Sequence, residues 1–385
     1  MDALILSCGT GGGHNAAGIA MKEQLEKRGH HVVMMNPYRL KSDRLASAIN
    51  GTYIKLAQKI PTAFGLLYRA GMLYRRLPFA SPIHYLNGKM GALLQDYLKR
   101  NHFDVIIMPH IFPAQILSNM RNNGLAIPKT IYIATDYTCI PFTEEATCDA
   151  YVIPHKKLAE EFSRYGVPTD KIHALGIPVL ESFSEPMSKN QAAKLLNLDP
   201  NKEYILISGG SMGAGKIEHV IRILLKWRQK DIHRELIVLC GSNHKLYKKL
   251  KRRYKREILL QEYTDKMAAY MKASEMIVTK PGGLCSTESA VSGLPILHIT
   301  PIPGCENSNM SYFSQHGMSI AIRHPQRELL TAVLSLQDDK RRLFMTQKQK
   351  KNIHPHAALD ICKLAEQLVQ NKVEKPYSTP LPPQS

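Results

Sequence analysis

Residues 203–217 read EYILISGGSMGAGKI, an apolar run that leads into a glycine-rich turn and then into the start of a helix. An apolar run without polar alternation is typical of a parallel strand that is buried on both faces of its sheet. Glycines after such a strand allow backbone amides and the N-terminus of the next helix to approach an anion closely. This stretch therefore predicts an α/β domain with an anion-binding turn at the end of one strand.

The turn nearly matches the phosphate loop of nucleoside triphosphatases. Gly210 is followed after four residues by Gly215 and Lys216, but the next residue is Ile217. The phosphate loop needs Ser or Thr at that position to hold Mg²⁺. A magnesium-dependent nucleotide kinase or ATPase is therefore kept only as an alternative interpretation.

Apolar runs of the same kind alternate with helix-length segments along most of the chain, which predicts parallel sheets and an α/β fold. The other runs are DALILS (2–7), HHVVMMN (30–36), DVIIMP (104–109), TIYIAT (130–135), AYVIP (150–154), ELIVLC (235–240), EMIVT (275–279) and PILHIT (295–300). The pattern restarts after the Pro- and Ser-rich interval 176–190. Because ligands of doubly wound sheets bind at the carboxyl ends of the strands, a substrate is expected in the cleft between two domains.

The predicted organisation has two doubly wound domains and a separate C-terminal segment. The boundaries are 1–178 for the first domain, 179–189 for the linker, 190–345 for the second domain, 346–373 for a helical segment and 374–385 for a disordered tail.

Composition indicates a globular protein, with 44% hydrophobic and 22% charged residues. The sequence has no apolar run of the roughly 20 residues that a membrane-spanning helix needs, and its first residues do not resemble a signal peptide. A cytoplasmic location is therefore expected. The seven cysteines form no C-x-x-C pair, which argues against both a disulfide framework and a zinc site.

The net charge of +19 points to an anionic partner. Lys and Arg dominate the stretch 245–256, and the segment 43–99 mixes aromatic, apolar and basic residues with few acidic ones. Such segments suit the surface of an anionic membrane, and Arg69, Arg75 and Arg76 are the expected contacts. Ordinary solvated helices, or a non-catalytic membrane-binding protein, are the alternatives. The sequence carries no nucleic-acid-binding motif, so no nucleic-acid partner is predicted.

Three polar or glycine-rich motifs follow predicted strands. The first, GTGGGH, ends in His14, which is suited to act as a general base or simply begins a helix. In the second, TKPGGLCSTE, Glu288 can accept the hydroxyls of a ribose, or it only favours the helix dipole. The third, PIPGCENSN (301–309), is a polar cluster that can bind sugar hydroxyls.

Taken in order, the motifs GTGGGH, TDY, GIPV, GGSMGAGK, YTDKM, TKPGGLCSTESAVSGLPIL and PGCENSN resemble one family of lipid-modifying glycosyltransferases. This family contains monogalactosyldiacylglycerol synthases and processive diacylglycerol glucosyltransferases, and it is similar to the enzyme that adds N-acetylglucosamine to the undecaprenyl-linked cell-wall precursor. The resemblance covers about residues 2–345 and is most specific over 263–309. It implies a GT-B fold of two Rossmann-like domains, with the acceptor site in the first and the donor site in the second.

The implied activity is the inverting transfer of glucose or galactose from a UDP-sugar to a diacylglycerol-type lipid, without a metal ion or cofactor. The implied location is peripheral, on the inner face of the cell membrane. A polyprenyl-linked or other acceptor is the alternative.

The resemblance also assigns residues to roles. His14 is implied as the base, with Gly12, Gly13 and Asp136 on the acceptor side. The implied donor-binding residues are Gly209, Gly210, Ser211 and Gly213 for the diphosphate, Tyr263 and Thr264 for the uracil, Glu288 for the ribose, and Glu306 and Asn309 for the sugar. Met267, Gly282 and Gly283 are implied as further donor-binding residues.

Three positions depart from the family pattern. Gly9 stands where several plant-type members have Asp, so a carboxylate partner for His14 is absent or comes from elsewhere, with Asp136 the candidate. Ile140 replaces a common His, and Cys305 replaces a common Gln. The identities of the sugar and of the acceptor therefore stay open at the level of the sequence.

Overall fold

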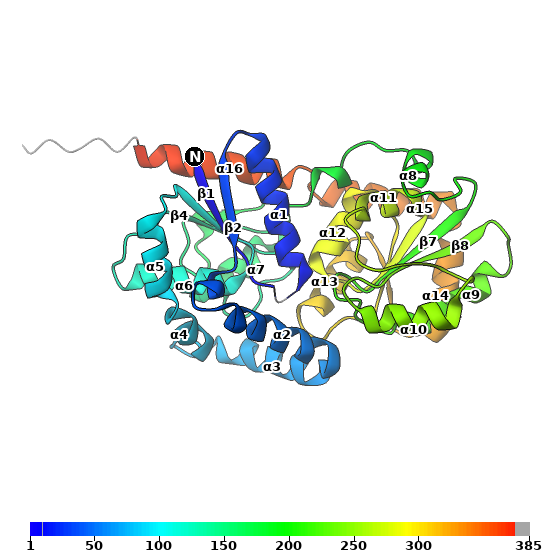
Figure 1. Cartoon of the computed structure of the whole chain (residues 1–385), viewed down its shortest axis with the longest axis horizontal. Coiled ribbons are helices and arrows are strands. Elements are labelled where there is room, and N and C mark those ends of the chain that lie inside the picture. The colour runs from blue at the N-terminus through cyan, green and yellow to red at the C-terminus, as the bar shows by residue number, and fades with distance from the viewer. Residues whose placement is uncertain (10, 374–385) are drawn as a thin grey trace, which may run out of the picture.

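The structure is a computed structural model that describes residues 1–9 and 11–373. Within these residues two six-stranded parallel sheets lie side by side, each covered by helices (Figure 1). This arrangement confirms the prediction of a GT-B fold with two Rossmann-like domains. The tail predicted to be disordered, 374–385, lies outside the described residues.

The first sheet has the strand order β2-β1-β3-β4-β5-β6, and each neighbouring pair is parallel. Its strands are β1 (Asp2–Leu6), β2 (His31–Met35), β3 (Val105–Met108), β4 (Lys129–Ile133), β5 (Ala150–Val152) and β6 (Ile172–His173). The helices of this domain are α1 (Gly12–Lys27), α2 (Asp43–Lys59), α3 (Pro61–Tyr74), α4 (Pro82–Gly88), α5 (Gly91–Arg100), α6 (Ile111–Asn122) and α7 (Ala159–Arg164).

The second sheet has the order β12-β11-β10-β7-β8-β9 and is parallel as well. Its strands are β7 (Glu203–Ser208), β8 (Arg234–Leu239), β9 (Leu259–Gln261), β10 (Met276–Thr279), β11 (Ile296–Ile299) and β12 (Ile320–Ile322). The helices are α8 (Lys189–Leu195), α9 (Ile217–Arg228), α10 (His244–Tyr254), α11 (Met267–Ala273), α12 (Gly283–Val291), α13 (Cys305–Gln315), α14 (Pro325–Ser335) and α15 (Asp339–Asn352).

Every apolar run that predicts a strand forms one, and the strand that precedes the glycine-rich turn, β7, lies inside the second sheet. The sequence missed three strands, β6, β9 and β12, which all lie at sheet edges. An edge strand pairs on one side only and is short here, so it lacks the continuous apolar run that marks a central strand.

The last helix returns to the first domain. α16 (Ala357–Val373) packs on the first sheet and on α1, where Ile361, Cys362 and Ala365 are buried against that sheet (Figure 1). Its Glu366 accepts hydrogen bonds from the Arg28 guanidinium at 2.7 and 2.8 Å. The chain therefore crosses between the domains twice, once in each direction.

The loop after β4 joins the two domains directly. The side chain of Asn309, at the domain boundary on α13, is fully buried. Its Oδ1 accepts a hydrogen bond from the Tyr137 amide at 2.7 Å, and its Nδ2 donates to Asp136 Oδ1 at 2.7 Å and to the Pro281 carbonyl at 3.0 Å. The Tyr137 hydroxyl lies 2.8 Å from the hydroxyl of Thr287 on α12. These contacts fix the loop of the first domain on two helices of the second.

The segment predicted to face a membrane, 43–99, forms α2, α3, α4 and most of α5, and α2 to α4 lie at the lower edge of the first domain in Figure 1. The exposed large apolar side chains of this segment include Leu66, Leu67, Leu73, Leu77 and Phe79. Among the described residues, no helix is long and apolar enough to cross a membrane. The segment therefore presents several large apolar side chains at the protein surface.

Arg75 does not belong to this surface, so the prediction that it contacts lipid is wrong. Its side chain is 2% exposed and pairs with Glu144 at 2.5 Å. The guanidinium also donates to the Cys139 carbonyl at 3.1 Å and stacks on Tyr165, 3.6 Å from the ring centroid. Arg75 therefore fastens the end of α3 to the domain, whereas Arg76 is exposed.

We expect Arg75→Gln to destabilise the protein by about 3 to 5 kcal/mol, because it leaves Glu144 half-buried without its cation. Arg76→Gln is the matched control and should change the free energy of unfolding by less than about 0.5 kcal/mol. Urea unfolding measures both. Equal stability of the two variants would contradict the role given to Arg75.

Candidate active site

A cavity of about 440 Å³ lies between the two domains. Its walls come from the loops that follow β1 and β4 in the first sheet and β7, β10 and β11 in the second. α1, α12 and α13 meet at this boundary (Figure 1). The carboxyl ends of both sheets therefore open onto one space, as the sequence predicts for a cleft between doubly wound domains.

The glycine-rich turn after β7 forms one wall. Gly210 and Ser211 line the cavity, whereas Gly209 and Gly213 lie behind them and shape the turn. Gly213 has a φ of 55°, and a Cβ there would lie 2.1 Å from the Cys240 carbonyl oxygen, so no other residue fits without a backbone shift. The turn thus packs tightly in front of α9.

Ser211 also faces the first domain. The Gly12 amide donates a hydrogen bond to Ser211 Oγ at 3.0 Å, and a Cβ at Gly12 would lie 2.2 Å from the same oxygen. The two glycine-rich turns, one from each domain, therefore touch across the cleft. Gly13 and Ser211 both line the cavity beside this contact.

Lys280 is a functional candidate that the sequence analysis did not single out. It lines the cavity, its Cε lies 3.0 Å from where a Cβ of Gly210 would stand, and its ammonium pairs with Glu306. Burial works to lower the pKa of Lys280, but the Glu306 carboxylate outweighs it and the pKa is raised. A charged ammonium therefore lies beside the glycine-rich turn, where an anion would bind.

Glu288 lines the cavity on α12, beyond Gly282 and Gly283, which line it as well. Burial raises the pKa of Glu288 to about 8. Without a partner that stabilises the charge, this carboxyl group is therefore largely protonated at pH 7. A ligand that donates hydrogen bonds to it would favour the charged carboxylate.

Tyr263, Thr264 and Met267 form the end of the cavity nearest α11, and all three line it. Thr264 Oγ1 accepts a hydrogen bond from the Lys266 amide at 3.0 Å, which holds the turn before α11. The Tyr263 side chain is 68% exposed, so its ring is free to cover a flat ligand.

His14 lines the cavity from the first domain. Its Nδ1 lies 2.8 Å from the Pro109 carbonyl oxygen and 2.9 Å from the Thr135 hydroxyl oxygen. Because a carbonyl only accepts, Nδ1 carries the proton and Nε2 keeps its lone pair. Burial lowers the pKa of His14, although nearby Asp136 raises it in part. The neutral imidazole with a basic Nε2 is the form that a general base needs.

The position of Asp136 bears on the partner expected for His14. Asp136 lines the cavity, but its carboxylate accepts from Asn309 and interacts with the Cys305 thiol, while His14 Nδ1 faces a backbone carbonyl. At Gly9 a Cβ would lie 2.6 Å from Asn50 Nδ2, so a longer side chain there would have to displace the Asn50 side chain. Asp136 therefore acts on His14 through its charge, and a backbone carbonyl orients the ring.

Of the two residues predicted to bind sugar hydroxyls, Glu306 and Asn309, only Glu306 lines the cavity. Glu306 lines the cavity, where Lys280 and the Ile302 amide hold its carboxylate, the latter at 2.8 Å from Oε2. Asn309 is fully buried, and both ends of its amide are bound to protein groups. The assignment of Asn309 to a sugar contact is therefore wrong, since its side chain joins the domains instead.

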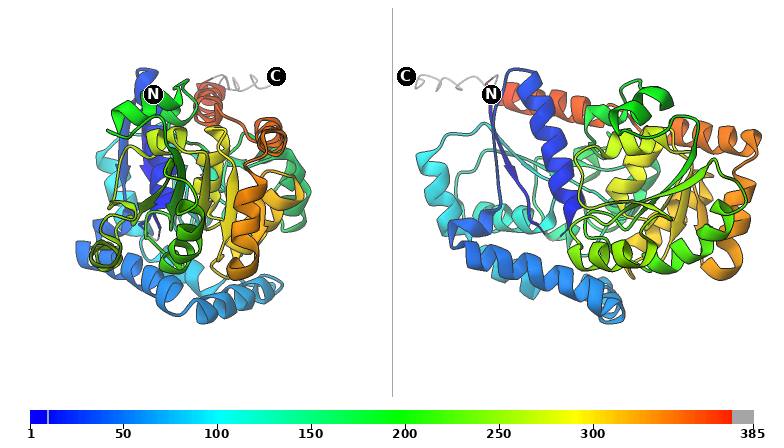
Figure 2. Two further views of the ribbon diagram at one scale, coloured as in Figure 1. Left: turned by 90° about the vertical axis from the view of Figure 1, so that its right-hand side faces the viewer. Right: turned by 45° about the vertical axis from the view of Figure 1, so that its right-hand side comes forward.

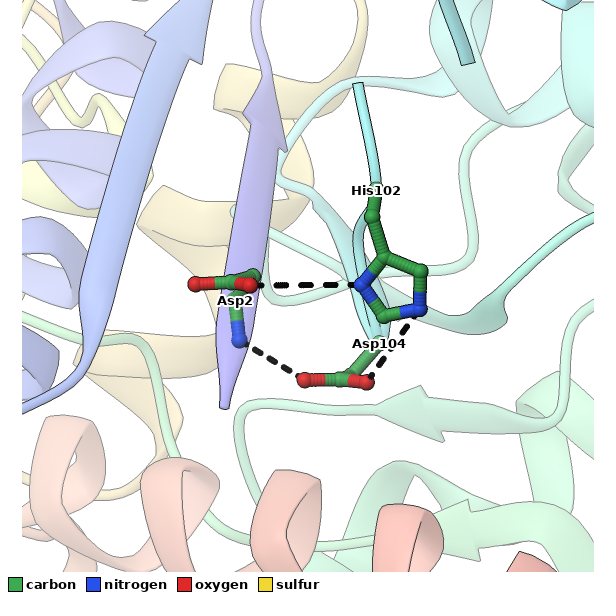
Figure 3. A group of neighbouring side chains, drawn as sticks. All are labelled: Asp2, His102 and Asp104. Carbon is green, nitrogen blue, oxygen red and sulfur yellow. Dashed lines mark hydrogen bonds and ion pairs between the residues drawn. The ribbon is translucent and has the colours of Figure 1, made fainter. Parts of the chain in front are cut away.

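One group of three close metal-type ligands exists among the residues that the structure describes: Asp2, His102 and Asp104 (Figure 3). Asp2 lies at the start of β1 and Asp104 just before β3, which is the end of the sheet opposite the cavity. Asp104 Oδ2 already accepts a hydrogen bond from the Asp2 amide at 2.7 Å. This group has no part in the site between the domains.

Solved structures share this fold over nearly the whole chain. MurG of Acinetobacter baumannii has a TM-score of 0.62 and 15% identity over 95% of this chain and 99% of its own. The structure of Staphylococcus aureus MnaA with UDP has a TM-score of 0.66 and 13% identity over 98% and 99%. These likenesses establish the GT-B-like fold.

The sequence comparisons are more specific. Two chains named "Processive diacylglycerol beta-glucosyltransferase", from Bacillus subtilis and Bacillus licheniformis, are both 26% identical over 360 residues. The match covers 91% of this chain and 91% of the B. subtilis relative, and 92% and 91% for B. licheniformis. Residues 14–179 match the family described as monogalactosyldiacylglycerol synthase, and residues 204–361 match the C-terminal domain of glycosyltransferase family 28. The two-domain cleft therefore belongs to a glycosyltransferase whose first domain matches the monogalactosyldiacylglycerol synthase family and whose second domain matches the C-terminal domain of glycosyltransferase family 28.

Proposed function

We propose that this enzyme transfers glucose or galactose from a UDP-sugar to a diacylglycerol-type lipid at the inner surface of the cell membrane. The observation that carries the proposal is the joint cavity. His14 of the first domain and the set of Gly210, Lys280 and Glu288 of the second all line it. The names of the relatives support a diacylglycerol acceptor and a glucosyl donor.

The donor would lie along the second domain. The amides of the glycine-rich turn and the ammonium of Lys280 would hold the diphosphate, and Ser211 would add a hydroxyl. Glu288 would accept the ribose hydroxyls, and Tyr263 with the backbone of Thr264 would flank the uracil. Glu306 would face the sugar. Fixed dipoles and one cation would then carry the charge that a metal ion carries elsewhere.

The reaction would be a single displacement. The acceptor hydroxyl gives its proton to Nε2 of His14 while its oxygen attacks the anomeric carbon of the sugar. The bond from that carbon to the diphosphate oxygen breaks, and UDP leaves with the electron pair. Attack from the side opposite to the leaving group inverts the anomeric configuration.

The lipid would reach the cavity from a membrane that contacts α3. The exposed apolar side chains Leu66, Leu67 and Leu73 share this helix with the exposed Arg69, a combination that suits the boundary between acyl chains and anionic headgroups.

A second basic surface faces the same side of the molecule. On α10, Lys249 and Arg253 pair with Glu218, whereas Lys245, Lys248 and Arg252 are exposed along one helix face. α10 and α3 both lie toward the lower side in the views of Figures 1 and 2. Both domains would therefore present cations to one anionic surface.

The direct test is incubation with UDP-glucose or UDP-galactose and vesicles that contain diacylglycerol and phosphatidylglycerol, followed by separation of the lipids. We expect a labelled glycolipid, little change on adding EDTA, and a loss of about 10² or more in rate for His14→Asn with unchanged UDP affinity. Transfer only to a polyprenyl-linked sugar would contradict the proposed diacylglycerol acceptor. Magnesium-dependent ATP hydrolysis without sugar transfer would contradict the proposed glycosyltransferase reaction.

Donor binding should depend on the protonation of Glu288. Because burial raises its pKa to about 8 and the ribose hydroxyls bind the carboxylate form best, the affinity for UDP-glucose should rise with pH and level off above pH 8. Glu288→Gln should remove this dependence and weaken binding at high pH by about 1 to 3 kcal/mol.

Isothermal calorimetry at pH values below and above 8 measures the effect. Glu262→Gln is the matched control, because Glu262 lines the same cavity but pairs with His244 at 2.9 Å. It should keep the pH dependence of the wild type. A wild-type affinity that does not change with pH would rule out the ribose contact of Glu288.

Membrane binding should depend on charge. Replacing Arg69 and Arg76 with Gln should weaken binding to phosphatidylglycerol vesicles by about 1 kcal/mol for each residue, and salt should weaken it further. Lys363→Gln on α16, which lies on the opposite side of the molecule from α3, is the control and should bind as the wild type does (Figure 1). Cosedimentation measures the binding. Vesicle binding that changes neither with salt nor with these substitutions would contradict the proposed membrane contact of α3.

A further inference from the structure

α3 has an outer face and an inner face with different partners. Leu66 and Leu73 on the outer face are 70% and 64% exposed. Gly65 and Gly71 on the inner face are buried. Glycine inside a helix lowers helix stability by about 1 kcal/mol relative to alanine. Two glycines on one face therefore suggest that a neighbouring segment packs too closely there for a larger side chain.

The inner face packs against the second domain at the donor cavity. A Cβ on Gly65 would lie 2.5 Å from Pro303 Cβ, and a Cβ on Gly304 would lie 3.1 Å from the Tyr68 ring. The loop 300–304 contacted in this way leads directly into Cys305 and Glu306, which line the cavity. The helix with the exposed leucines is therefore also a support for the donor site.

The contacted loop has a positive φ at both ends, which glycine adopts readily but threonine does not. Thr300 has a φ of 44° and Gly304 a φ of 127°. A β-branched residue rarely adopts a positive φ, and such a conformation persists only where the surrounding structure holds it. Within the loop, the Ile302 amide donates to Glu306 Oε2 at 2.8 Å, so the backbone path of the loop sets the position of that carboxylate. The contact with α3 is one of the constraints that hold this path.

The far end of α3 is anchored in the first domain. Gly71 packs on Pro141 and Phe142, with 3.2 Å between Pro141 Cβ and the place of a Gly71 Cβ, and Arg75 pairs with Glu144. These partners belong to the segment that continues from the loop of Asp136. α3 thus bridges the acceptor-side loop and the donor-side loop, so a shift of the helix would move the contacts of both.

We propose that α3 couples membrane docking to donor binding. When its outer face is seated on an anionic bilayer, its inner face holds the loop 300–304 in the donor-binding arrangement, and the affinity for the UDP-sugar rises. This inference rests on the proposed membrane contact of α3. Coupling between two binding events is reciprocal, so bound UDP-sugar strengthens attachment to the bilayer by the same factor.

The first measurement is calorimetric titration of UDP-glucose with and without phosphatidylglycerol vesicles that lack diacylglycerol, so that no lipid acceptor turns over. We expect the donor affinity to rise by at least about five-fold on vesicles, the lower end of usual couplings between sites. Vesicle binding with an unchanged donor affinity overturns the coupling and leaves the membrane contact intact. Absence of vesicle binding overturns the membrane contact and the coupling together.

The second measurement uses Gly65→Ala, which pushes against Pro303 without weakening the helix or altering its outer face. We expect vesicle binding to persist while the donor KM rises and the gain in affinity on vesicles falls to less than half. The matched control is Gly51→Ala on α2, where a Cβ has open space, and it should keep the full gain.

Thermal melting checks that both alanine variants fold. If Gly65→Ala unfolds, Tyr68→Ala, which lies on the same helix, removes the contact of the Tyr68 ring with Gly304 and should reduce the gain in donor affinity on vesicles to the same extent. A folded Gly65→Ala or Tyr68→Ala variant that keeps the full gain on vesicles overturns the proposal.

Discussion

The buried amide of Asn309 is the contact on which the geometry of the cleft depends. Its oxygen accepts from the Tyr137 amide and its nitrogen donates to Asp136 and Pro281. Loss of this amide would leave a buried backbone N–H and a buried carbonyl without partners, which is costly. These bonds therefore fix the position of the loop after β4 relative to the second domain. Thr135, which contacts His14, is held beside the part of the cavity that the second domain lines.

The backbone of the same loop also packs closely against the start of α12, which leaves little room for the two domains to shift. A Cβ on Gly283 would lie 2.0 Å from the Thr135 carbonyl oxygen, so only glycine allows α12 to begin where it does. Glu288 follows from that start, because it lies in the second turn of the same helix. The ring of Tyr137 stacks on Tyr312 at a centroid distance of 4.9 Å and closes the boundary behind the loop. His14 and Glu288 thus face one cavity because a single loop is held between two helices.

Much of this architecture could be predicted from the sequence. Apolar runs are strong signals for central parallel strands, and the glycine-rich turn after β7 appears in the structure as the wall of a cavity. The edge strands β6, β9 and β12 were missed because half-paired, short strands need no continuous apolar run. Family resemblance indicated the acidic and amide residues near the cleft, but a motif does not say which way a side chain points.

The wrong predictions for Asn309 and Arg75 come from side-chain orientation, which the sequence does not show. Asn309 has the residue type of a sugar ligand, yet its amide turns toward the first domain. Arg75 has the charge of a lipid contact, yet helix geometry places it on the inner face with Glu144, one residue before the exposed Arg76. Lys280 was present in the quoted motif TKPGG, and only its position beside Gly210 shows its relation to the turn. These facts depend on contacts between residues far apart in the sequence, and local patterns do not contain them.

We propose that His14 and the donor-binding groups act from opposite sides of one anomeric carbon. The anomeric configuration of the glycolipid product, read by proton NMR from the coupling at the anomeric position, tests this arrangement. Because the sugar of the UDP donor is α-linked, a single displacement with His14 as base predicts a β-linked glycolipid. An α-linked product would rule out this arrangement, since it would require attack from the face that the leaving diphosphate occupies.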